Sequence, residues 1–262
     1  MCGAGALPAR MAAEARRQGW RVVAFAFADA AGVSPYADRL VRSRITEIGP
    51  VLDGLRQHAI PAVLFSGRFS HADVLTGCHD ATLARIAQRA GSLVDSRLLG
   101  SLERMFAEMG VELLDQRTFL GEGLEPEGCL AERAPSGDEW LDIQAGMKAA
   151  RMIADAHIGQ AVVVKRGAVV AVEASEGTTE AIRRGTALAG AGAVVAKAAA
   201  RDHDYRFDIP TVGPDTVAAM AAGQGTAIAI EARRVFVADR EATVACARTA
   251  GITLVSVASG AD

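Results

Sequence analysis

Short apolar runs alternate with stretches of helical periodicity in the first half of the chain. The runs at 22–27, 61–65 and 111–114 have the length of buried strands. Apolar residues at helical spacing predict a helix over 98–109, and a second helix is expected over 9–18. Alternation of strands and helices is typical of a parallel sheet. We therefore predict an α/β fold with an N-terminal Rossmann-like domain.

The second half has a mixed pattern. A helical pattern covers 140–156, and the apolar runs 161–164 and 168–172 flank a short turn, which predicts a hairpin. Further strands are expected at 193–196, 226–230, 235–237 and 252–257. Gly, Glu and Pro accumulate between the halves. We predict an N-terminal domain over 1–122, a linker over 123–139 and a C-terminal α+β catalytic domain over 140–262.

The start of the chain lacks an expected strand. A glycine-rich turn of this kind normally follows a buried strand, yet only Met1 and Cys2 precede Gly3. Two explanations are open: the sheet has lost its first strand, or the given start lies downstream of the true one. The second is favoured, because a sheet without its central strand exposes its edges.

Composition excludes several classes of protein. Apolar residues make up 50% of the 262 residues, and the net charge is −3, which gives no general attraction to nucleic acid. The longest apolar run, 187–196, is about half of what a membrane-spanning helix needs. The four cysteines show no C-x-x-C spacing, so a reducing cytoplasm with free thiols is expected.

Glycines near the start form the first candidate site. Gly3 and Gly5 leave backbone N–H groups bare just before a helix, a geometry suited to phosphate. An ordinary strand–helix turn explains them equally well, and Pro8 stands where a dinucleotide fingerprint needs its third glycine, so a nicotinamide enzyme is disfavoured. Gly67 follows a predicted strand at the sheet edge where ligands bind in such folds.

Carboxylates and cations gather in the second half. Glu173 and Glu176 follow a predicted strand, and such a pair suits magnesium or a general base. Alternatively, Ser175 or Thr178 simply caps the next helix. Lys197 precedes a block at 201–213 in which charged and apolar residues interleave, a composition that suits phosphoryl chemistry.

Four segments together resemble a known family. They are GAGALP at 3–8, IGQAVVV at 158–164, VAVEASEGT at 170–178 and RFDIPTVG at 206–213. In order and spacing the chain resembles the UDP-2,3-diacylglucosamine pyrophosphatases of lipid A biosynthesis, in the form without metallophosphatase motifs. The resemblance runs nearly end to end.

The resemblance implies an activity and a set of residues. It implies Mg²⁺-assisted hydrolysis of the UDP-sugar pyrophosphate in a crevice between two domains, by a homodimer that works in the cytoplasm at the inner membrane. Asp208 matches the family's essential acid. We expect metal binding by Asp208, Glu176 and Asp204. Substrate binding is expected at Gly3, Gly5, Ala6, Leu7, Gly67, Gln160, Glu173, Gly177, Thr178, Lys197 and Arg206.

The chain departs from the family pattern at two acidic positions. The family writes Asp where this chain has His157, and again where it has Thr179. Loss of two acids near a metal site weakens cation binding, since Mg²⁺ is held by only one or two carboxylates. A nucleotide-binding protein of the same fold, with weak or no turnover, is therefore the alternative.

Overall fold

The computed structural model describes residues 1–69, 80–90 and 96–258. The chain forms two compact units. The N-terminal unit holds Met1–Gly121 together with Asp204–Asp208, and the C-terminal unit holds Glu122–His203 and Ile209–Asp262. The segment 123–139, where a linker is expected, belongs to the C-terminal unit and contributes a strand to its sheet.

Strands in the N-terminal unit form two parallel pairs. Strand β1 (Val23–Ala26) pairs with β2 (Arg39–Arg42), and β3 (Ala62–Val63) pairs with β4 (Glu112–Leu113). Cys2 joins the two pairs, because it forms parallel bridges both to Ala26 and to Ser66, beyond the end of β3. The first residues of the chain thus lie between the two pairs.

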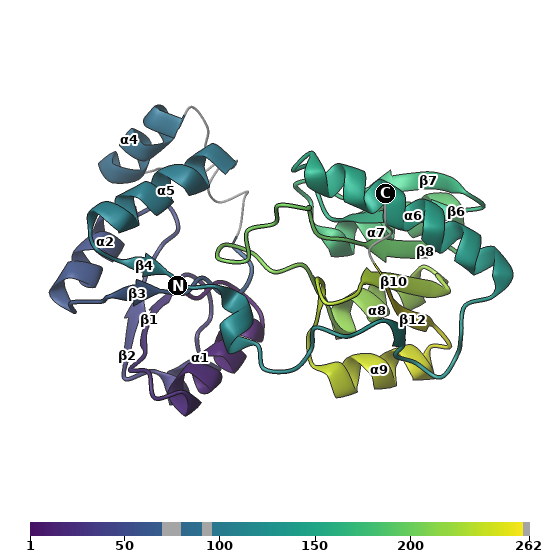
Figure 1. Ribbon diagram of the computed structural model, residues 1–262, viewed down its shortest axis with the longest axis horizontal. Coiled ribbons are helices and arrows are strands. Elements are labelled where there is room, and N and C mark those ends of the chain that lie inside the picture. The colour runs from purple at the N-terminus through teal and green to yellow at the C-terminus, as the bar shows by residue number, and fades with distance from the viewer. Residues whose placement is uncertain (70–79, 91–95, 259–262) are drawn as a thin grey trace. The chain divides into compact units, whose positions relative to one another are not determined.

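Helices cover these strands (Figure 1). They are α1 (Leu7–Arg17), α2 (Ile48–Gln57), α4 (Ala81–Ala90) and α5 (Ser96–Glu108), with 3-10 turns η1 (Ser34–Tyr36) and η2 (Gln116–Phe119). Phe25 of β1, Leu55 of α2 and Phe106 of α5 are buried in one apolar cluster. On the other side, Ala24 packs with Ala12 of α1. Successive β1 residues therefore face opposite layers, as a strand requires.

A six-stranded mixed sheet organises the C-terminal unit. Its order is β5-β12-β10-β8-β6-β7. The bounds are β5 (Gly128–Cys129), β6 (Ala161–Lys165), β7 (Ala168–Val172), β8 (Val194–Lys197), β10 (Ala227–Glu231) and β12 (Thr253–Val257). Strands β8, β10 and β12 are parallel, whereas the β6–β7 hairpin and β5 run antiparallel to their neighbours. A small parallel pair, β9 (Thr211–Val212) with β11 (Phe236–Val237), lies outside this sheet.

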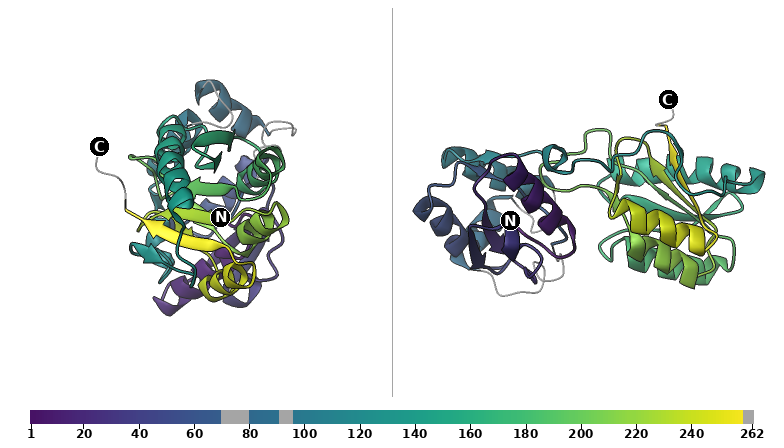
Figure 2. Two further views of the ribbon diagram at one scale, coloured as in Figure 1. Left: turned by 90° about the vertical axis from the view of Figure 1, so that its right-hand side faces the viewer. Right: turned by 90° about the horizontal axis from the view of Figure 1, so that it is seen from below.

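Helices cover both faces of the six-stranded sheet (Figures 1 and 2). Helix α6 (Gly137–Asp155) packs on one face, where Gly146 approaches Val162 and Val164. Helices α7 (Thr178–Ala189), α8 (Pro214–Ala222) and α9 (Arg240–Thr249) cover the other face, which presents Val163 and Val195. Burial on both faces explains why these strands are continuous apolar runs without alternation.

The mixed α/β class is confirmed. The predicted helices near 9–18, 98–109 and 140–156, the hairpin and the later strands are all present, with bounds shifted by a few residues. A continuous Rossmann-like sheet in the N-terminal unit stays a prediction, because the strands there form separate two-stranded sheets. Strand β2 and helix α2 were not predicted: β2 is largely exposed, and α2 carries Gly49, Pro50 and Gly54.

Candidate functional site

One edge of the six-stranded sheet collects polar side chains. Lys197 ends β8 and lies in register with Ala161, which begins β6. Because β7 runs antiparallel to β6, Glu173 directly after β7 returns to the same edge. Its N–H donates to the Ala161 carbonyl at 2.9 Å. The polar residues that end these strands are thus neighbours in space although they are far apart in sequence.

A chain of hydrogen bonds links three of these side chains, here called the Lys–Thr–Glu cluster. Lys197 Nζ donates to Thr178 Oγ1 at 2.7 Å, and Thr178 Oγ1 donates to Glu173 Oε1 at 2.7 Å. Lys197 is 4% exposed and Glu173 8%. A cation and a carboxylate thus lie buried on either side of one hydroxyl, which satisfies both charges.

The second oxygen of Glu173 ties the cluster to the start of β6. Glu173 Oε2 accepts the N–H of Gln160 at 3.2 Å. Next to Gln160, a Cβ added to Gly159 would lie 2.1 Å from the Glu173 carbonyl oxygen. Only glycine allows these two backbones to come so close. The sequence IGQ therefore fixes the position of Glu173.

Helix α7 begins at the Lys–Thr–Glu cluster. Gly177 precedes it with φ of 82°, a conformation that favours glycine, and along the described chain no side chain caps this helix. The N–H groups of the first turn thus lie beside Thr178 and Lys197. A helix N-terminus next to a cation is a favourable place for an anion.

Glu176 is turned away from the expected pair with Glu173. One oxygen of Glu176 accepts from Arg184 at 2.6 Å, and the other accepts the N–H of Ala174 at 3.1 Å. The Arg184 guanidinium lowers the pKa of this carboxyl. The carboxylate is therefore engaged with its own loop and helix.

The sequence analysis missed a buried ion pair beside the cluster. Glu231, at the end of β10, is fully buried and pairs with Arg151 of α6. Its other oxygen accepts the N–H of Ala199 at 3.0 Å, two residues after Lys197. The signal available in the sequence is an acid at the end of the apolar run AIAIE. This pair positions the chain that leaves β8.

The glycine turn of the N-terminal unit is built by close backbone contact. Ala4 and Arg68 exchange two backbone hydrogen bonds of 2.8 and 2.9 Å. A Cβ on Gly3 would lie 2.3 Å from the Arg68 oxygen, and a Cβ on Gly67 would lie 2.7 Å from the Ala4 oxygen. Gly3 and Gly67 are therefore explained by packing.

Gly5 differs from these two glycines. It has φ of 101° and open space where a side chain would be. Ala6 and Leu7 then begin α1, and in the part of the chain that the structure describes no side chain caps this helix. The expected glycine turn is thus present before a helix N-terminus, and its binding of phosphate stays a prediction.

Asp204–Asp208 packs as part of the N-terminal unit. The Phe207 ring lies 5.5 Å from that of Phe65, and Gln116 donates its N–H to the Tyr205 carbonyl at 3.1 Å. Asp208, which ends the segment, is exposed. The expectation that Asp208 acts in a crevice between two domains stays a prediction.

Arg206 of the same segment is held between two carboxylates. Its guanidinium makes a two-pronged contact with Asp204, with distances of 2.9 and 2.7 Å, and another with Glu103 of α5 at 2.5 Å. These two carboxylates, Asp204 first, raise the pKa of Arg206. Its positive charge is thus already offset within the unit.

The expected metal ligands do not come together within either unit. Asp204 and Asp208 belong to the N-terminal unit and Glu176 to the C-terminal one. Over residues 1–69, 80–90 and 96–258, no group of three or more Asp, Glu, His or Cys side chains is placed to hold a metal ion. Arginines already pair with Asp204 and Glu176. These carboxylates belong to different units, so their joint binding of a metal ion stays a prediction.

Together, these features define a two-unit mixed α/β protein in which α1 and α7 each begin at a glycine turn, an arrangement typical of proteins that bind anionic ligands. Two family models cover most of the chain: the LpxI N-terminal domain matches residues 1–122, and the LpxI C-terminal domain matches residues 126–255. The chain belongs to the LpxI family.

A full-length relative agrees with the family assignment. The UDP-2,3-diacylglucosamine pyrophosphatase LpxI of Caulobacter vibrioides is 32% identical to this chain, over 98% of the chain and 96% of the relative. The similarity therefore includes both units and the segments that join them.

Proposed function

We propose that this protein hydrolyses the pyrophosphate of UDP-2,3-diacylglucosamine to UMP and 2,3-diacylglucosamine 1-phosphate. Water adds its oxygen to one phosphorus, the bridging P–O bond breaks, and one proton is released. Membership of the LpxI family and the activity for which the Caulobacter relative is named support this proposal. Within the chain, the Lys–Thr–Glu cluster beside the open end of α7 is the observation that carries it.

The roles of the cluster follow from its chemistry. Lys197 Nζ has three hydrogens and gives one to Thr178, and the first-turn N–H groups of α7 lie next to it. We assign Lys197, Thr178 and the backbone after Gly177 to a phosphate of the substrate. Glu173 fixes the Thr178 hydroxyl, and through it the direction of Lys197. Preorganised donors of this kind stabilise charge that develops on phosphate oxygens.

Asp208 is proposed as the general base. An exposed carboxylate is accessible to water and can take the proton that the attacking water loses. Dependence on Mg²⁺ is a separate proposal with Asp208 as its ligand, and no step above requires the cation. Purified protein assayed with and without EDTA, and with added Mg²⁺, tests it.

UMP release from UDP-2,3-diacylglucosamine tests the activity. We expect Asp208→Asn to lower kcat by about 10²–10⁴, the usual contribution of a general base. Asp215→Asn is the matched control, since Asp215 is also exposed and lies seven residues further on. Absence of UMP release by the unmutated protein contradicts the activity. An equal loss in both variants contradicts the role of Asp208.

A nucleotide-binding protein without turnover is the second candidate. His157 and Thr179, which replace acids of the family pattern, favour it, and His157 adopts a φ of 54° in the turn before β6. Calorimetry with UMP separates the two candidates: binding without hydrolysis supports this one. Restored hydrolysis in a His157→Asp, Thr179→Asp variant then identifies the two positions responsible.

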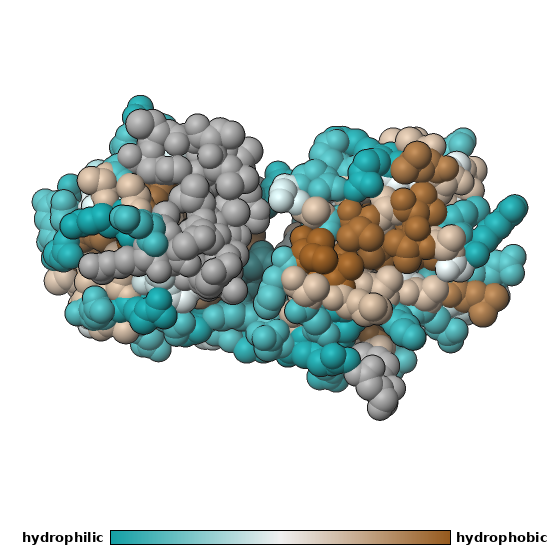
Figure 3. All heavy atoms as spheres, turned by 90° about the horizontal axis from the view of Figure 1, so that it is seen from above, coloured by the Kyte–Doolittle hydropathy of each residue, from teal (hydrophilic) through white to brown (hydrophobic). Residues whose placement is uncertain are grey.

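A homodimer and contact with the inner membrane are proposed as well. The C-terminal unit exposes large apolar side chains, and Figure 3 shows apolar residues gathered on one of its faces. Those exposed among the described residues include Trp140, Leu141, Met152, Ile158, Val169 and Leu188. Within the described ranges, no helix is long and apolar enough to cross a membrane. Sedimentation and vesicle flotation test the two proposals separately.

A further inference from the structure

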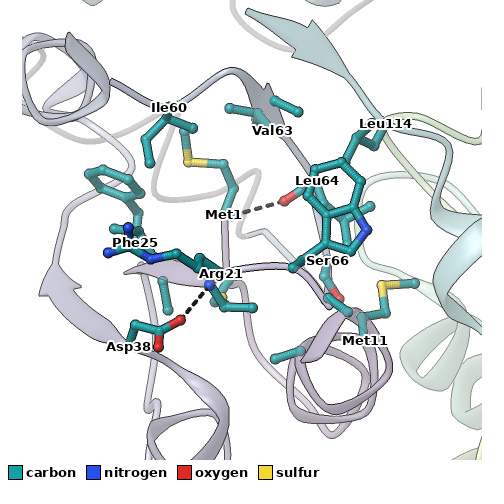
Figure 4. A pocket seen from close by; sticks show the side chains of 18 of the residues that line it. Met1, Met11, Arg21, Phe25, Asp38, Ile60, Val63, Leu64, Ser66 and Leu114 are labelled. Atoms are coloured by element: carbon teal, nitrogen blue, oxygen red, sulfur yellow. Dashed lines mark hydrogen bonds between the residues drawn. The ribbon is translucent and has the colours of Figure 1, made fainter. Parts of the chain in front are cut away.

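A cavity of about 620 Å³ lies inside the N-terminal unit, between β1 and β3. Residues 21–25 line one side and residues 60–64 the other. Met11 and Ala15 of α1 also line it, as does Leu55 of α2. Figure 4 shows Met1 between Phe25 and Leu64. The cavity is thus bounded by two strands and, above and below them, by apolar helix residues.

The spacing of the two strands is that of a sheet with one strand between them. Cys2 donates its N–H to the Phe25 carbonyl at 2.8 Å and accepts from the Phe27 N–H at 2.9 Å. On the other side, the Ser66 N–H donates to the Met1 carbonyl at 2.9 Å. The flanking strands are therefore about two strand spacings apart, roughly 10 Å. Beyond Met1 this gap continues as the cavity.

The same ladder directs further backbone groups into the cavity. In a parallel ladder, alternate residues of a strand face the same neighbour. The carbonyls of Phe25 and Leu64 accept hydrogen bonds from residues 2 and 1. Their N–H groups therefore point to the strand positions that would come directly before Met1. By the same alternation, Val23 and Ala62 face the positions beyond those.

The amino group of Met1 is placed as a peptide N–H would be. It donates to the Leu64 carbonyl at 2.9 Å, and Met1 is 8% exposed. Burial lowers the pKa of this amine, since an ammonium ion is disfavoured away from water. An amide at this position makes the same hydrogen bond without carrying a charge.

We propose that this cavity is a strand acceptor that takes an extended apolar polypeptide segment, parallel to β1 and β3 and in line with residues 1–2. Arg21 lies five residues before Ala26, and Ile60 lies six before Ser66, the two partners of Cys2. Met1 occupies the first of these positions, which leaves room for four or five residues. Helix residues on both faces require apolar side chains such as Val and Ile.

The expected ligand-binding edge is separate from this cavity. In open α/β sheets, ligands bind beyond the carboxyl ends of the strands, where the glycine turn lies. The cavity lies toward the amino ends of β1 and β3. The proposal that the cavity binds a polypeptide segment is therefore independent of the proposed activity.

The test supplies such a segment as residues added in front of Met1. Two proteins carry Met-Lys and five residues before Met1, either Val-Ile-Val-Ile-Val or Ser-Gly-Ser-Gly-Ser. Both are made with Trp140→Phe, so that fluorescence reports on Trp20, which lines the cavity. We expect the apolar extension to raise Tm by roughly 5–10 °C relative to the Ser-Gly protein. It should also slow amide exchange at Val23, Phe25, Ala62 and Leu64.

Two further variants separate a strand from a non-specific apolar tail. A Val-Val extension reaches only the position opposite Val23, so it should protect Phe25 and Leu64 but not Ala62. Val-Ile-Pro-Ile-Val, which lacks one N–H, should lose part of the rise in Tm. The proposal is overturned by equal Tm values for the apolar and Ser-Gly extensions. Unchanged exchange at Phe25 and Leu64 overturns it as well.

Discussion

The two units differ in how far their charged side chains are exposed to solvent. In the C-terminal unit, Glu231 and Lys197 are buried at the ends of strands of a continuous six-stranded sheet. Glu231 pairs with Arg151, and Lys197 donates a hydrogen bond to Thr178. In the N-terminal unit, Arg206 and Glu103 form an ion pair that solvent reaches. The strands there are short pairs, joined through Cys2.

The difference follows from the sheets. A wide sheet with helices on both faces excludes water from the ends of its strands. A charged side chain there therefore needs a hydrogen-bonding or ionic partner in a fixed position. Short strand pairs leave charges in water, where screening makes each pair weak. Loss of a charge should therefore cost stability in the C-terminal unit and little in the N-terminal one. Each unit holds one tryptophan, Trp20 or Trp140, so replacing the other with Phe lets each be followed separately.

The largest effect is expected at Glu231. Glu231→Ala leaves Arg151, whose side chain is only 17% exposed, without this carboxylate, and it removes the acceptor for the Ala199 N–H. Removing one partner of a buried pair costs about 3–5 kcal/mol. Urea unfolding followed by Trp140, in a Trp20→Phe background, measures the free energy of unfolding.

A double replacement is the control for Glu231→Ala. Glu231→Leu with Arg151→Met removes both charges and keeps the volume, so most of the lost stability should return. If Glu231→Ala costs less than about 1 kcal/mol, burial of charge does not distinguish the two units.

A smaller, pH-dependent effect is expected at Glu139, in the first turn of α6. Burial raises the pKa of this carboxyl, but hydrogen bonds from Arg133 and the Ser136 N–H outweigh it, so the pKa falls from 4.5 to about 2. A depressed folded-state pKa stabilises the folded protein above pH 4.5, and this stability is lost as the pH falls toward 2. The shift corresponds to roughly 3 kcal/mol.

The measurement compares unfolding free energies at pH 6 and pH 3. Glu139→Gln should reduce the loss between these pH values by about 2 kcal/mol, and it should be less stable than the unmutated protein at pH 6. Asp138→Asn, the neighbouring residue in the same turn, should keep the pH dependence. An unchanged slope in Glu139→Gln contradicts the assignment.

The features that the sequence predicts correctly depend on residues close together along the chain. Polar residues at the ends of apolar runs, such as Glu173 and Lys197, mark where strands end. The family resemblance adds Gln160 and Thr178 to the same expected set, and the structure brings the four residues together. Their role in binding substrate stays a prediction.

Two features depend on contacts that the sequence does not encode locally. Glu176, in the loop before α7, pairs with Arg184, which lies within α7 eight residues further along the chain. The segment 204–208 packs in the N-terminal unit through Phe207 and Phe65, which are 142 residues apart in sequence. Neither pairing has a periodicity from which it can be predicted.

The smallest effect is expected at Glu103 in the N-terminal unit. Glu103 and Arg206 have side chains 42% and 35% exposed, and Arg206 keeps Asp204 when Glu103 is replaced. Exposed pairs contribute about 0–1 kcal/mol, so Glu103→Gln should shift unfolding followed by Trp20 by no more than this. A double-mutant cycle with Arg206→Met isolates the pair, and 0.5 M NaCl should reduce its coupling further, since salt screens exposed charges. A coupling above about 2 kcal/mol would mean that this pair behaves like the buried one at Glu231, and the contrast between the units would then fail.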